Sequence, residues 1–273
     1  MNVPDSATIS AAHAKARAAA GDDDAILTDL LPWAASFASA PVSGFTVGAV
    51  VRGRSGALYA GTNFEFARLP LSASVHAEQA ALANASLHGE RGVDLLAVSA
   101  SPCGHCRQFL NELDNASRLR ILIPEKAPAT LAELLPASFG PSDLGITGRL
   151  LDTDHHALTA AVSDDLAAAA LAAANASYAP YTRTYAGVAL RLRDGTLATG
   201  RYAECAAYNP SLPAFQAALV DLGLRRAGFD TIADAVLVEA AGVTSQRSAA
   251  AAALDALAGI PLRYLTAVAR EDR

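Results

Sequence analysis

The sequence predicts an α/β protein made of two tandem αβα domains, each a mixed sheet flanked by helices, of which the second is a degenerate copy. Three observations support this fold class. The chain has 273 residues, enough for two ordinary domains. A pattern of punctuating glycines and prolines occurs twice at a constant spacing. Between these marks, strand-like and helix-like segments alternate, as they do in α/β proteins.

The repeat is visible without gaps over 25 residues. PVSGFTVGAVVRGRSGALYAGTNFE (41–65) aligns with PYTRTYAGVALRLRDGTLATGRYAE (180–204) at an offset of 139. The identical positions include one proline pair and three glycine pairs, residues that mark turns for steric reasons. After a shortening of two residues, AEQAAL from Ala77 aligns with AFQAAL from Ala214. We therefore expect both halves to share one fold.

In the first copy, strands near 45–52 and 57–63 flank a glycine-containing turn, which is typical of a hairpin. The elements expected next are a helix near 76–88, an apolar strand at Leu95–Ser99, a helix from Cys103 and a strand at Leu119–Ile123.

The second copy predicts the same series. Its hairpin turns at Asp194-Gly195. The expected elements are strands at Gly187–Arg193 and Leu197–Tyr202, a helix at Leu212–Arg226, a strand at Ala235–Glu239, a helix at Ser248–Ala258 and a strand at Leu262–Val268.

The segment Glu125–Asp154 is rich in proline and glycine and is interpreted as the connection between the copies. We place an N-terminal extension, expected to be helical, at residues 1–21. The first domain is then 22–142, the linker 143–159 and the second domain 160–273.

Composition excludes several classes of protein. Lysine and arginine total 21 and aspartate and glutamate 27, so the net charge of −6 provides no basic field for a polynucleotide. The first residues lack the apolar core of a signal peptide, and no segment has the roughly 20 apolar residues of a membrane span. We expect a soluble, cytoplasmic protein with no nucleic acid or membrane partner. Three cysteines do not make a disulfide framework.

The residues that predict chemistry are His76-Ala77-Glu78 and Pro102-Cys103-Gly104-His105-Cys106. Cysteines three positions apart at a helix start lie on one face, where the helix dipole favours thiolate. Two thiolates and an imidazole suit tetrahedral Zn²⁺ with its fourth position open, which is typical of a catalytic site. Glu78 is placed to assist a bound water.

Simpler interpretations exist for each of these residues. Cys103 and Cys106 could be buried thiols or half of a structural zinc site, whose fourth ligand would have to be His105. One helical turn does not easily direct His105 to the side of both cysteines. Glu78 could merely favour the positive end of a helix.

The combination of motifs resembles a known family. VHAEQAAL, SPCGHCRQFLNEL, PASFGPSDL and YAECAAYNPSLP together are similar to the homodimeric, two-domain bacterial-type zinc-dependent cytidine deaminases. The resemblance covers about Asp22 to Val268. It implies two tandem cytidine-deaminase-like domains and a twofold dimer in which the partner chain completes each active site.

The resemblance also implies residue roles. His76, Cys103 and Cys106 match the ligands of one Zn²⁺ per chain, and Glu78 matches the proton shuttle. Zinc-bound hydroxide is then expected to attack C4 of cytosine, while Glu78 takes the proton of water, delivers it to N3 and assists the departure of ammonia.

Four further residues match positions that bind substrate. Asn63 and Glu65 match the pair that binds the sugar, although both could be turn residues without the resemblance. Phe45 and Phe139 match aromatic positions that line the base pocket.

The function implied is hydrolytic deamination of cytidine and 2′-deoxycytidine in pyrimidine salvage. Alternatives are a related nucleoside or base deaminase of the same fold, a catalytically inactive nucleoside-binding protein, and an editing deaminase on single-stranded nucleic acid, which the acidic composition disfavours.

The second copy departs from the motif. Pro213 stands where the first copy has His76, Phe215 stands where it has Glu78, and no Cys-x-x-Cys follows. We expect this copy to bind no metal and to have a structural role.

Overall fold

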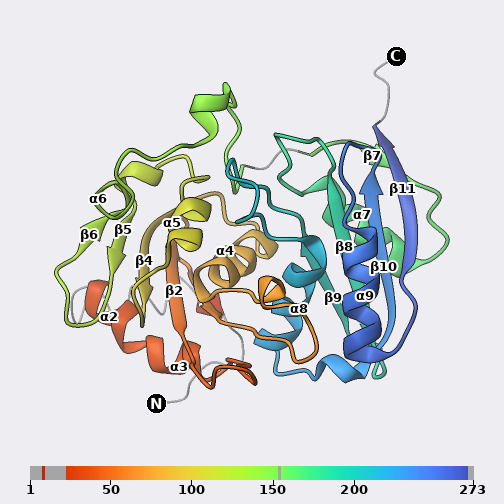
Figure 1. Ribbon diagram of the computed structural model, residues 1–273, viewed down its shortest axis with the longest axis horizontal. Coiled ribbons are helices and arrows are strands. Elements are labelled where there is room, and N and C mark those ends of the chain that lie inside the picture. The colour runs from red at the N-terminus through yellow and green to blue at the C-terminus, as the bar shows by residue number, and fades with distance from the viewer. Residues whose placement is uncertain (1–7, 10–22, 153–154, 270–273) are drawn as a thin grey trace.

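The computed structural model describes residues 8–9, 23–152 and 155–269. It contains two mixed sheets, one from each half of the chain, with helices α4 (Ala77–Leu87) and α8 (Ala214–Leu224) lying between them (Figure 1). The duplication predicted from the sequence is therefore confirmed as two sheets with related topology.

In the first sheet the strand order is β1-β3-β2-β4-β5-β6. Only the β4 and β5 pair is parallel, and every other pair is antiparallel. The strands are β1 (Thr8–Ile9), β2 (Gly48–Gly53), β3 (Leu58–Thr62), β4 (Val93–Val98), β5 (Arg120–Leu122) and β6 (Ala129–Thr130).

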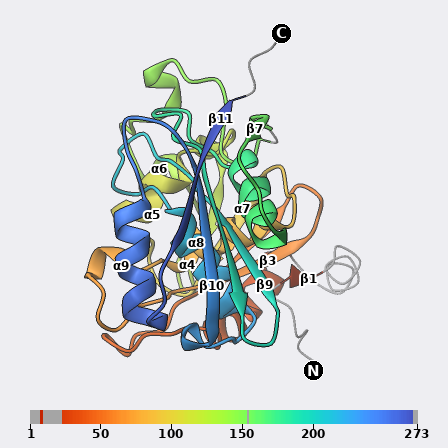
Figure 2. The same ribbon diagram turned by 90° about the vertical axis from the view of Figure 1, so that its right-hand side faces the viewer.

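The second sheet has the order β7-β11-β10-β8-β9, again with a single parallel pair, β10 and β11. The strands are β7 (Leu158–Thr159), β8 (Ala186–Leu192), β9 (Leu197–Arg201), β10 (Ile232–Ala240) and β11 (Arg263–Ala269). Helix α7 (Asp165–Asn175) covers one face, and α9 (Arg247–Ala258) covers the other (Figure 2).

One repeated glycine pair, Gly61 and Gly200, lies where a helix passes directly over a strand. A β-carbon at Gly61 would lie 2.2 Å from the amide nitrogen of Ala81 in α4, and one at Gly200 would lie 2.2 Å from that of Ala218 in α8. No side chain fits at such a distance. These glycines therefore let each helix lie close against its sheet.

A second pair, Gly48 and Gly187, lies under a helix on the opposite face of each sheet. Gly48 directly precedes Ala49, the cross-strand partner of Gly61, so Gly48 and Gly61 point to opposite sides of the sheet. A β-carbon at Gly48 would lie 2.3 Å from the carbonyl oxygen of Leu31 in α3 (Leu31–Ala35), which follows α2 (Asp23–Asp29). Each sheet is thus covered on both faces.

The third pair makes the hairpin turns. Gly56 and Gly195 both have φ of +86°, a backbone conformation that glycine adopts without steric cost. The two hairpins, β2–β3 and β8–β9, therefore turn in the same way.

Every strand and helix expected in the two copies is present, with ends that differ by a few residues. The connection was predicted less well, because β6 and the short helix α6 (Leu131–Leu134) lie inside Glu125–Asp154, and β7 lies inside the expected linker. Elements of two to four residues are too short to show a period.

The N-terminal part of the first domain is helical in α2 and α3. The helix expected at residues 1–21 lies outside the described residues, except for Thr8 and Ile9, which form strand β1 and pair with β3.

The two halves share one apolar core, in which α4 packs against α8. The ring of Phe64 occupies space that a β-carbon at Gly223 of α8 would fill, since that carbon would lie 2.1 Å from it. Within the described part of the chain, no helix is long and apolar enough to span a membrane.

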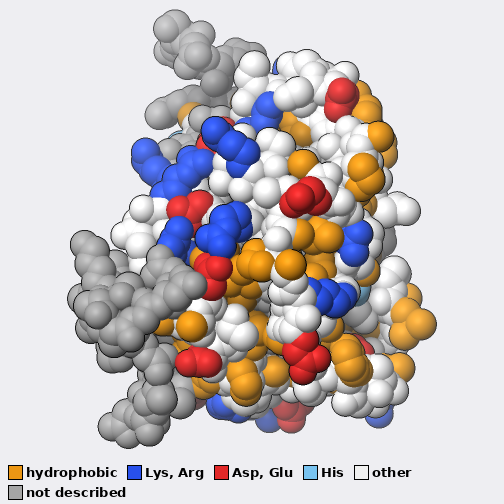
Figure 3. All heavy atoms as spheres, turned by 90° about the vertical axis from the view of Figure 1, so that its left-hand side faces the viewer, with side chains coloured by type: hydrophobic (Ala, Val, Ile, Leu, Met, Phe, Trp, Pro, Cys, Tyr) orange, Lys and Arg blue, Asp and Glu red, His pale blue; other side chains and the backbone are white. Residues whose placement is uncertain are grey.

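On the face beside β5, β6 and α2, basic and acidic side chains are interspersed (Figure 3). Arg120 pairs with Asp24 at 2.6 Å there.

Candidate active site

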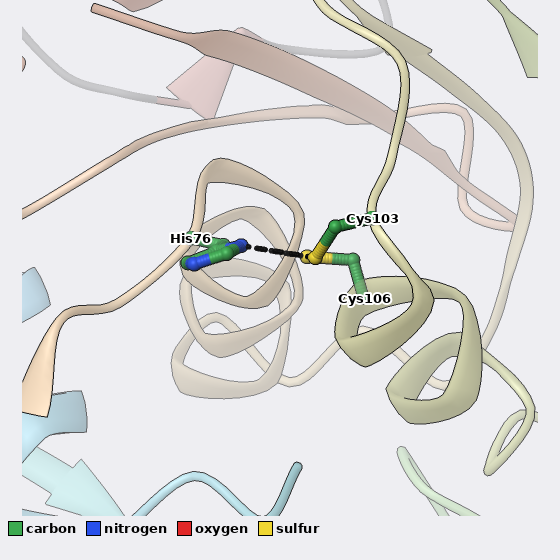
Figure 4. A group of neighbouring side chains, drawn as sticks. All are labelled: His76, Cys103 and Cys106. Carbon is green, nitrogen blue, oxygen red and sulfur yellow. Dashed lines mark hydrogen bonds between the residues drawn. The ribbon is translucent and has the colours of Figure 1, made fainter. Parts of the chain in front are cut away.

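Three possible metal ligands meet at the starts of two helices. His76 is the N-cap residue of α4, Cys103 is the N-cap residue of α5 (Gly104–Leu110), and Cys106 lies in the first turn of α5. Both N-cap residues have extended backbones. Their side chains therefore point back across the helix ends and toward one another (Figure 4).

The spacing of the three ligand atoms fits a tetrahedral ion. Nδ1 of His76 lies 3.4 Å from Sγ of Cys103 and 3.2 Å from Sγ of Cys106, and the two sulfurs are 3.7 Å apart. Ordinary zinc bond lengths place tetrahedral ligands roughly 3.8 Å (S to S) and roughly 3.6 Å (S to N) apart. The three residues can therefore hold one zinc ion and leave the fourth position open.

Within the described residues, this is the one group of three or more histidine, cysteine or acidic side chains close enough to share a metal. His105 is outside the group. Its Nε2 lies 3.3 Å from the carbonyl oxygen of Asn209, in the second half of the chain. The arrangement therefore agrees with a site that has three protein ligands rather than four.

The two thiols have opposite pKa shifts. A hydrogen bond joins the two sulfurs, and this bond with the backbone N–H groups of the helix start lowers the pKa of Cys103 to about 4. The same bond, together with burial, raises the pKa of Cys106. One thiolate is thus already formed at neutral pH, and metal binding has to remove one further proton.

Glu78 lies two residues after His76, in the first turn of α4. Its side chain is only 4% exposed, and burial raises the pKa of its carboxyl group. A carboxyl group shielded from water beside an open metal position is suited to carry protons.

The site opens into a cavity of about 350 Å³, a size suited to a small molecule. His76, Glu78 and Cys103 are among its lining residues. The other lining residues are Ser43, Phe45, Val47, Asn63, Glu65, Leu71, Ser74, Val75, Ala77, Ala100 and Ser101.

Asn63 and Glu65 lie on the cavity wall just after β3, and both side chains also bind the loop before β2. Asn63 accepts a hydrogen bond from the amide of Val47 at 2.8 Å and donates one to the carbonyl of Phe45 at 2.8 Å. Glu65 accepts from the amide and the hydroxyl of Ser43, which lowers its pKa. Each group retains hydrogen-bonding capacity toward the cavity.

The two phenylalanines differ in position. Phe45 lines the cavity and is 61% exposed. Phe139 does not line it within the described chain; it is 45% exposed, and its carbonyl accepts hydrogen bonds from Gln108 and Asn111. The structure therefore brings seven of the eight candidate residues together, and Phe139 is the one that lies apart.

Several lining residues carried no sequence signal. Leu71, Ser74 and Val75 come from the loop between β3 and α4, and Ala100 and Ser101 come from the loop after β4. Only their nearness to the histidine and cysteine motifs could have indicated them.

In the second half, other residues stand in the places of His76 and Glu78. Pro213 is the N-cap residue of α8, as His76 is of α4, and the side chain of Phe215 is 1% exposed where the first copy has Glu78. The degenerate character predicted for this copy is confirmed.

A metal position with one open coordination place, a buried carboxylic acid and a small cavity define the site of a metal-dependent hydrolase acting on small molecules. Two family models match the chain, over residues 22–121 and 131–251, and both are described as the cytidine and deoxycytidylate deaminase zinc-binding region.

Individual relatives agree with the family models. A cytidine deaminase of Photobacterium profundum is 48% identical over 247 residues, which are 90% of this chain and 84% of that protein. A cytidine deaminase of Serratia proteamaculans is 49% identical over 237 residues, 86% of this chain and 81% of that protein. The crystal structure of cytidine deaminase from Mycobacterium tuberculosis aligns with 44% of this chain and 99% of its own, at 32% identity and a TM-score of 0.40. The chain belongs to the cytidine deaminase family, and zinc is the metal of that family's binding region.

Proposed function

We propose that this protein hydrolyses cytidine and 2′-deoxycytidine to uridine and 2′-deoxyuridine, releasing ammonia. The observation that supports this most directly is the metal-ligand group of His76, Cys103 and Cys106 beside a cavity of about 350 Å³ that is also lined by the buried Glu78. About 48% identity to proteins named cytidine deaminase, over most of the chain, supports the choice of substrate.

His76, Cys103 and Cys106 would hold the zinc ion, which would supply Lewis-acid activation of water for attack on C4 of the base. Thiolates are strong ligands, and Cys103 is ready to act as one because its pKa is lowered to about 4. Extended N-cap backbones at both helix starts hold the ligand atoms in place before the metal arrives.

Glu78 moves protons. Its carboxylate takes a proton from the attacking water and gives it to N3 of the base, and it then passes the second proton to the departing amino group. The balance is one water consumed and one ammonia released for each nucleoside. Burial of Glu78 keeps bulk water from competing for these transfers.

Asn63 and Glu65 bind the sugar hydroxyls, since a carboxylate accepts from a hydroxyl and an amide can both donate and accept. Phe45 covers the base at the cavity rim. Phe139 lies outside the cavity of one chain, so in this proposal it approaches the base only in the dimer.

The proposed assembly is a homodimer that completes each site. Val42, Phe45 and Leu71 beside the cavity are 59%, 61% and 75% exposed, and a second chain would cover such apolar groups. We further propose that 22–142 is the catalytic unit, that 160–273 is structural, and that the enzyme works in the cytoplasm in pyrimidine salvage.

The decisive experiment is ultraviolet absorbance of purified protein with measured zinc content, using cytidine, deoxycytidine, cytosine and CMP in parallel. Loss of the cytidine signal with about one zinc per chain, and no change with cytosine, is the expected result. Turnover of another substrate alone would indicate a related deaminase. Bound zinc with no turnover of any substrate would favour a nucleoside-binding protein and contradict the proposal.

A further inference from the structure

We propose that a loop of the degenerate half sets the geometry of the metal site by holding both ligand-bearing helices. This loop, Cys205–Ser211, is called the bridging loop below. The inference rests on the proposed function only in taking His76, Cys103 and Cys106 as the metal ligands. It assigns positioning roles to Gln79 and His105, neither of which lines the substrate cavity.

The bridging loop has a conformation that is fixed by its own hydrogen bonds. The amide of Tyr208 donates to the carbonyl of Cys205 at 2.8 Å, and the amide of Ser211 donates to the carbonyl of Tyr208 at 2.9 Å. The hydroxyl of Ser211 accepts from the amide of Cys205 at 3.0 Å. Tyr208 has φ of +60°, an uncommon backbone conformation for a residue other than glycine.

The loop contacts α5 and the turn after it at three places along one side. The carbonyl of Asn209 accepts from His105, and the thiol of Cys205 lies 3.6 Å from the carbonyl of Gln108. The amide of Ala206 donates to the carboxylate of Glu112 at 2.8 Å. His105, Gln108 and Glu112 follow one another at about one-turn spacing, so this side of α5 faces the bridging loop.

Glu112 stabilises the contact between the bridging loop and the turn after α5. Its side chain is fully buried, and it also accepts hydrogen bonds from the hydroxyls of Tyr178 at 2.9 Å and Tyr181 at 2.6 Å. All three donors come from the second half of the chain. Both hydroxyls donate to Oε2 and the Ala206 amide donates to Oε1, so loss of that amide would leave one oxygen of a buried carboxylate without its partner.

The loop contacts α4 through Gln79. The side-chain amide of Gln79 donates to the carbonyl of Pro210 at 2.8 Å, and both residues are buried. Gln79 directly follows Glu78, as His105 lies between Cys103 and Cys106. Two consecutive carbonyls, those of Asn209 and Pro210, therefore hold the two helices within one helical turn of the metal ligands.

This arrangement matters because the ligands come from different helices. His76 belongs to the start of α4, and both cysteines belong to α5. Small relative shifts of α4 and α5 would change the nitrogen-to-sulfur distances that a metal requires. A rigid loop that bonds to both helices removes that freedom.

The repeat shows which segment of the first copy corresponds to the bridging loop. In each copy one residue after the second strand of the hairpin pairs with one just before the next helix: Phe64 with Val75, and Ala203 with Leu212. The intervening segment is two residues shorter in the second copy. The longer one lines the cavity, and the shorter one is the bridging loop.

The test compares Gln79→Met with a control on the same helix. Asn84 of α4 donates to the carbonyl of Ala60 at 2.9 Å, so Asn84→Leu removes a buried amide-to-carbonyl bond that stays within the first half. Zinc affinity of the full-length protein is measured by competition with a chromogenic chelator, and ligand geometry by the visible spectrum of the Co²⁺-substituted protein.

We expect Gln79→Met to weaken zinc binding roughly tenfold or more and to shift the cobalt bands. Asn84→Leu should lower the melting temperature comparably, with unchanged zinc affinity and cobalt spectrum. His105→Phe, at a half-buried position, is a second variant with the same expectation, should Gln79→Met fail to fold. In Gln79→Met the kcat should fall while KM stays within about twofold, because Gln79 is outside the cavity.

Wild-type zinc affinity and cobalt spectrum in both Gln79→Met and His105→Phe would overturn the positioning role, as would an equal loss in Asn84→Leu. Failure of the wild-type protein to deaminate any nucleoside while it binds zinc would overturn the proposed function instead. The two failures are therefore distinguishable.

Discussion

Glu65 and Glu204 make the same set of hydrogen bonds in the two copies. Glu65 accepts from the amides of Val42 and Ser43 and from the Ser43 hydroxyl. Glu204 accepts from the amides of Tyr181 and Thr182 and from the Thr182 hydroxyl. Because the same bonds form in the copy that lacks the metal-ligand motif, they have a structural function in both copies.

A first prediction separates the two functions of this position. Glu65→Ala and Glu204→Ala should each lower the free energy of unfolding, by about 0.5–1.5 kcal/mol per hydrogen bond lost, and more in Glu204→Ala because its amide donors are partly buried whereas those of Glu65 are exposed. Only Glu65→Ala should also raise KM for cytidine, with zinc content unchanged. Denaturant unfolding and steady-state kinetics measure these effects. Equal KM values in the two variants would remove Glu65 from the substrate site.

Glu78→Gln should keep the fold and the zinc but lower kcat about 10²- to 10⁴-fold, because the amide cannot carry protons while the ligands remain. Metal analysis and kcat at saturating cytidine test this expectation. Near-normal turnover by a zinc-loaded variant would exclude Glu78 as the proton carrier.

Cys103→Ala should lose both zinc and activity, because two remaining ligands do not retain the ion against a chelator. Removal of zinc from the wild-type protein should have the same effect on activity, and added zinc should restore it only in the wild type. Metal content after dialysis is the measurement. A fully metallated, active Cys103→Ala variant would contradict the ligand set.

The apoprotein should show an unusual pH dependence of alkylation. Cys103 is exposed and its pKa is lowered to about 4, so its thiolate is fully formed above about pH 5. Cys106 and Cys205 are buried with raised pKa values and should react slowly. Peptide mass spectrometry after iodoacetamide treatment at pH 4–9, with and without zinc, measures this. A rate for Cys103 that rises only near pH 8–9 would argue against the expected thiolate, and zinc should protect it throughout.

The space around two glycines predicts opposite effects on stability when each is replaced by alanine. Gly200→Ala should destabilise the protein by at least about 1–3 kcal/mol, since its β-carbon would lie 2.2 Å from the backbone of Ala218. Gly104→Ala should be neutral or stabilising by about 0.5–1 kcal/mol, because it lies in a helix with no atom near the new carbon. Thermal unfolding of both variants would decide, and a stable Gly200→Ala protein would contradict the packing argument.

The strands, the main helices and seven of the eight candidate residues could be predicted because they depend on local patterns: glycine punctuation, apolar runs and ligand spacing. Phe139 and the short elements β6, α6 and β7 could not be placed, because their positions depend on contacts with distant parts of the chain. The hydrogen bonds from the bridging loop to His105 and Gln79 span more than 100 residues, and no local pattern encodes them.

The packing of the Phe64 ring against Gly223 also has a consequence for synthesis of the protein. Phe64 is 1% exposed in the finished structure, but the helix that covers it lies more than 140 residues further along the chain. At about 5–20 residues per second, roughly 7–30 s pass between the two on the ribosome. During that interval the first half of the chain has an uncovered apolar face, so we expect the nascent chain to bind chaperones and to aggregate if translation stalls.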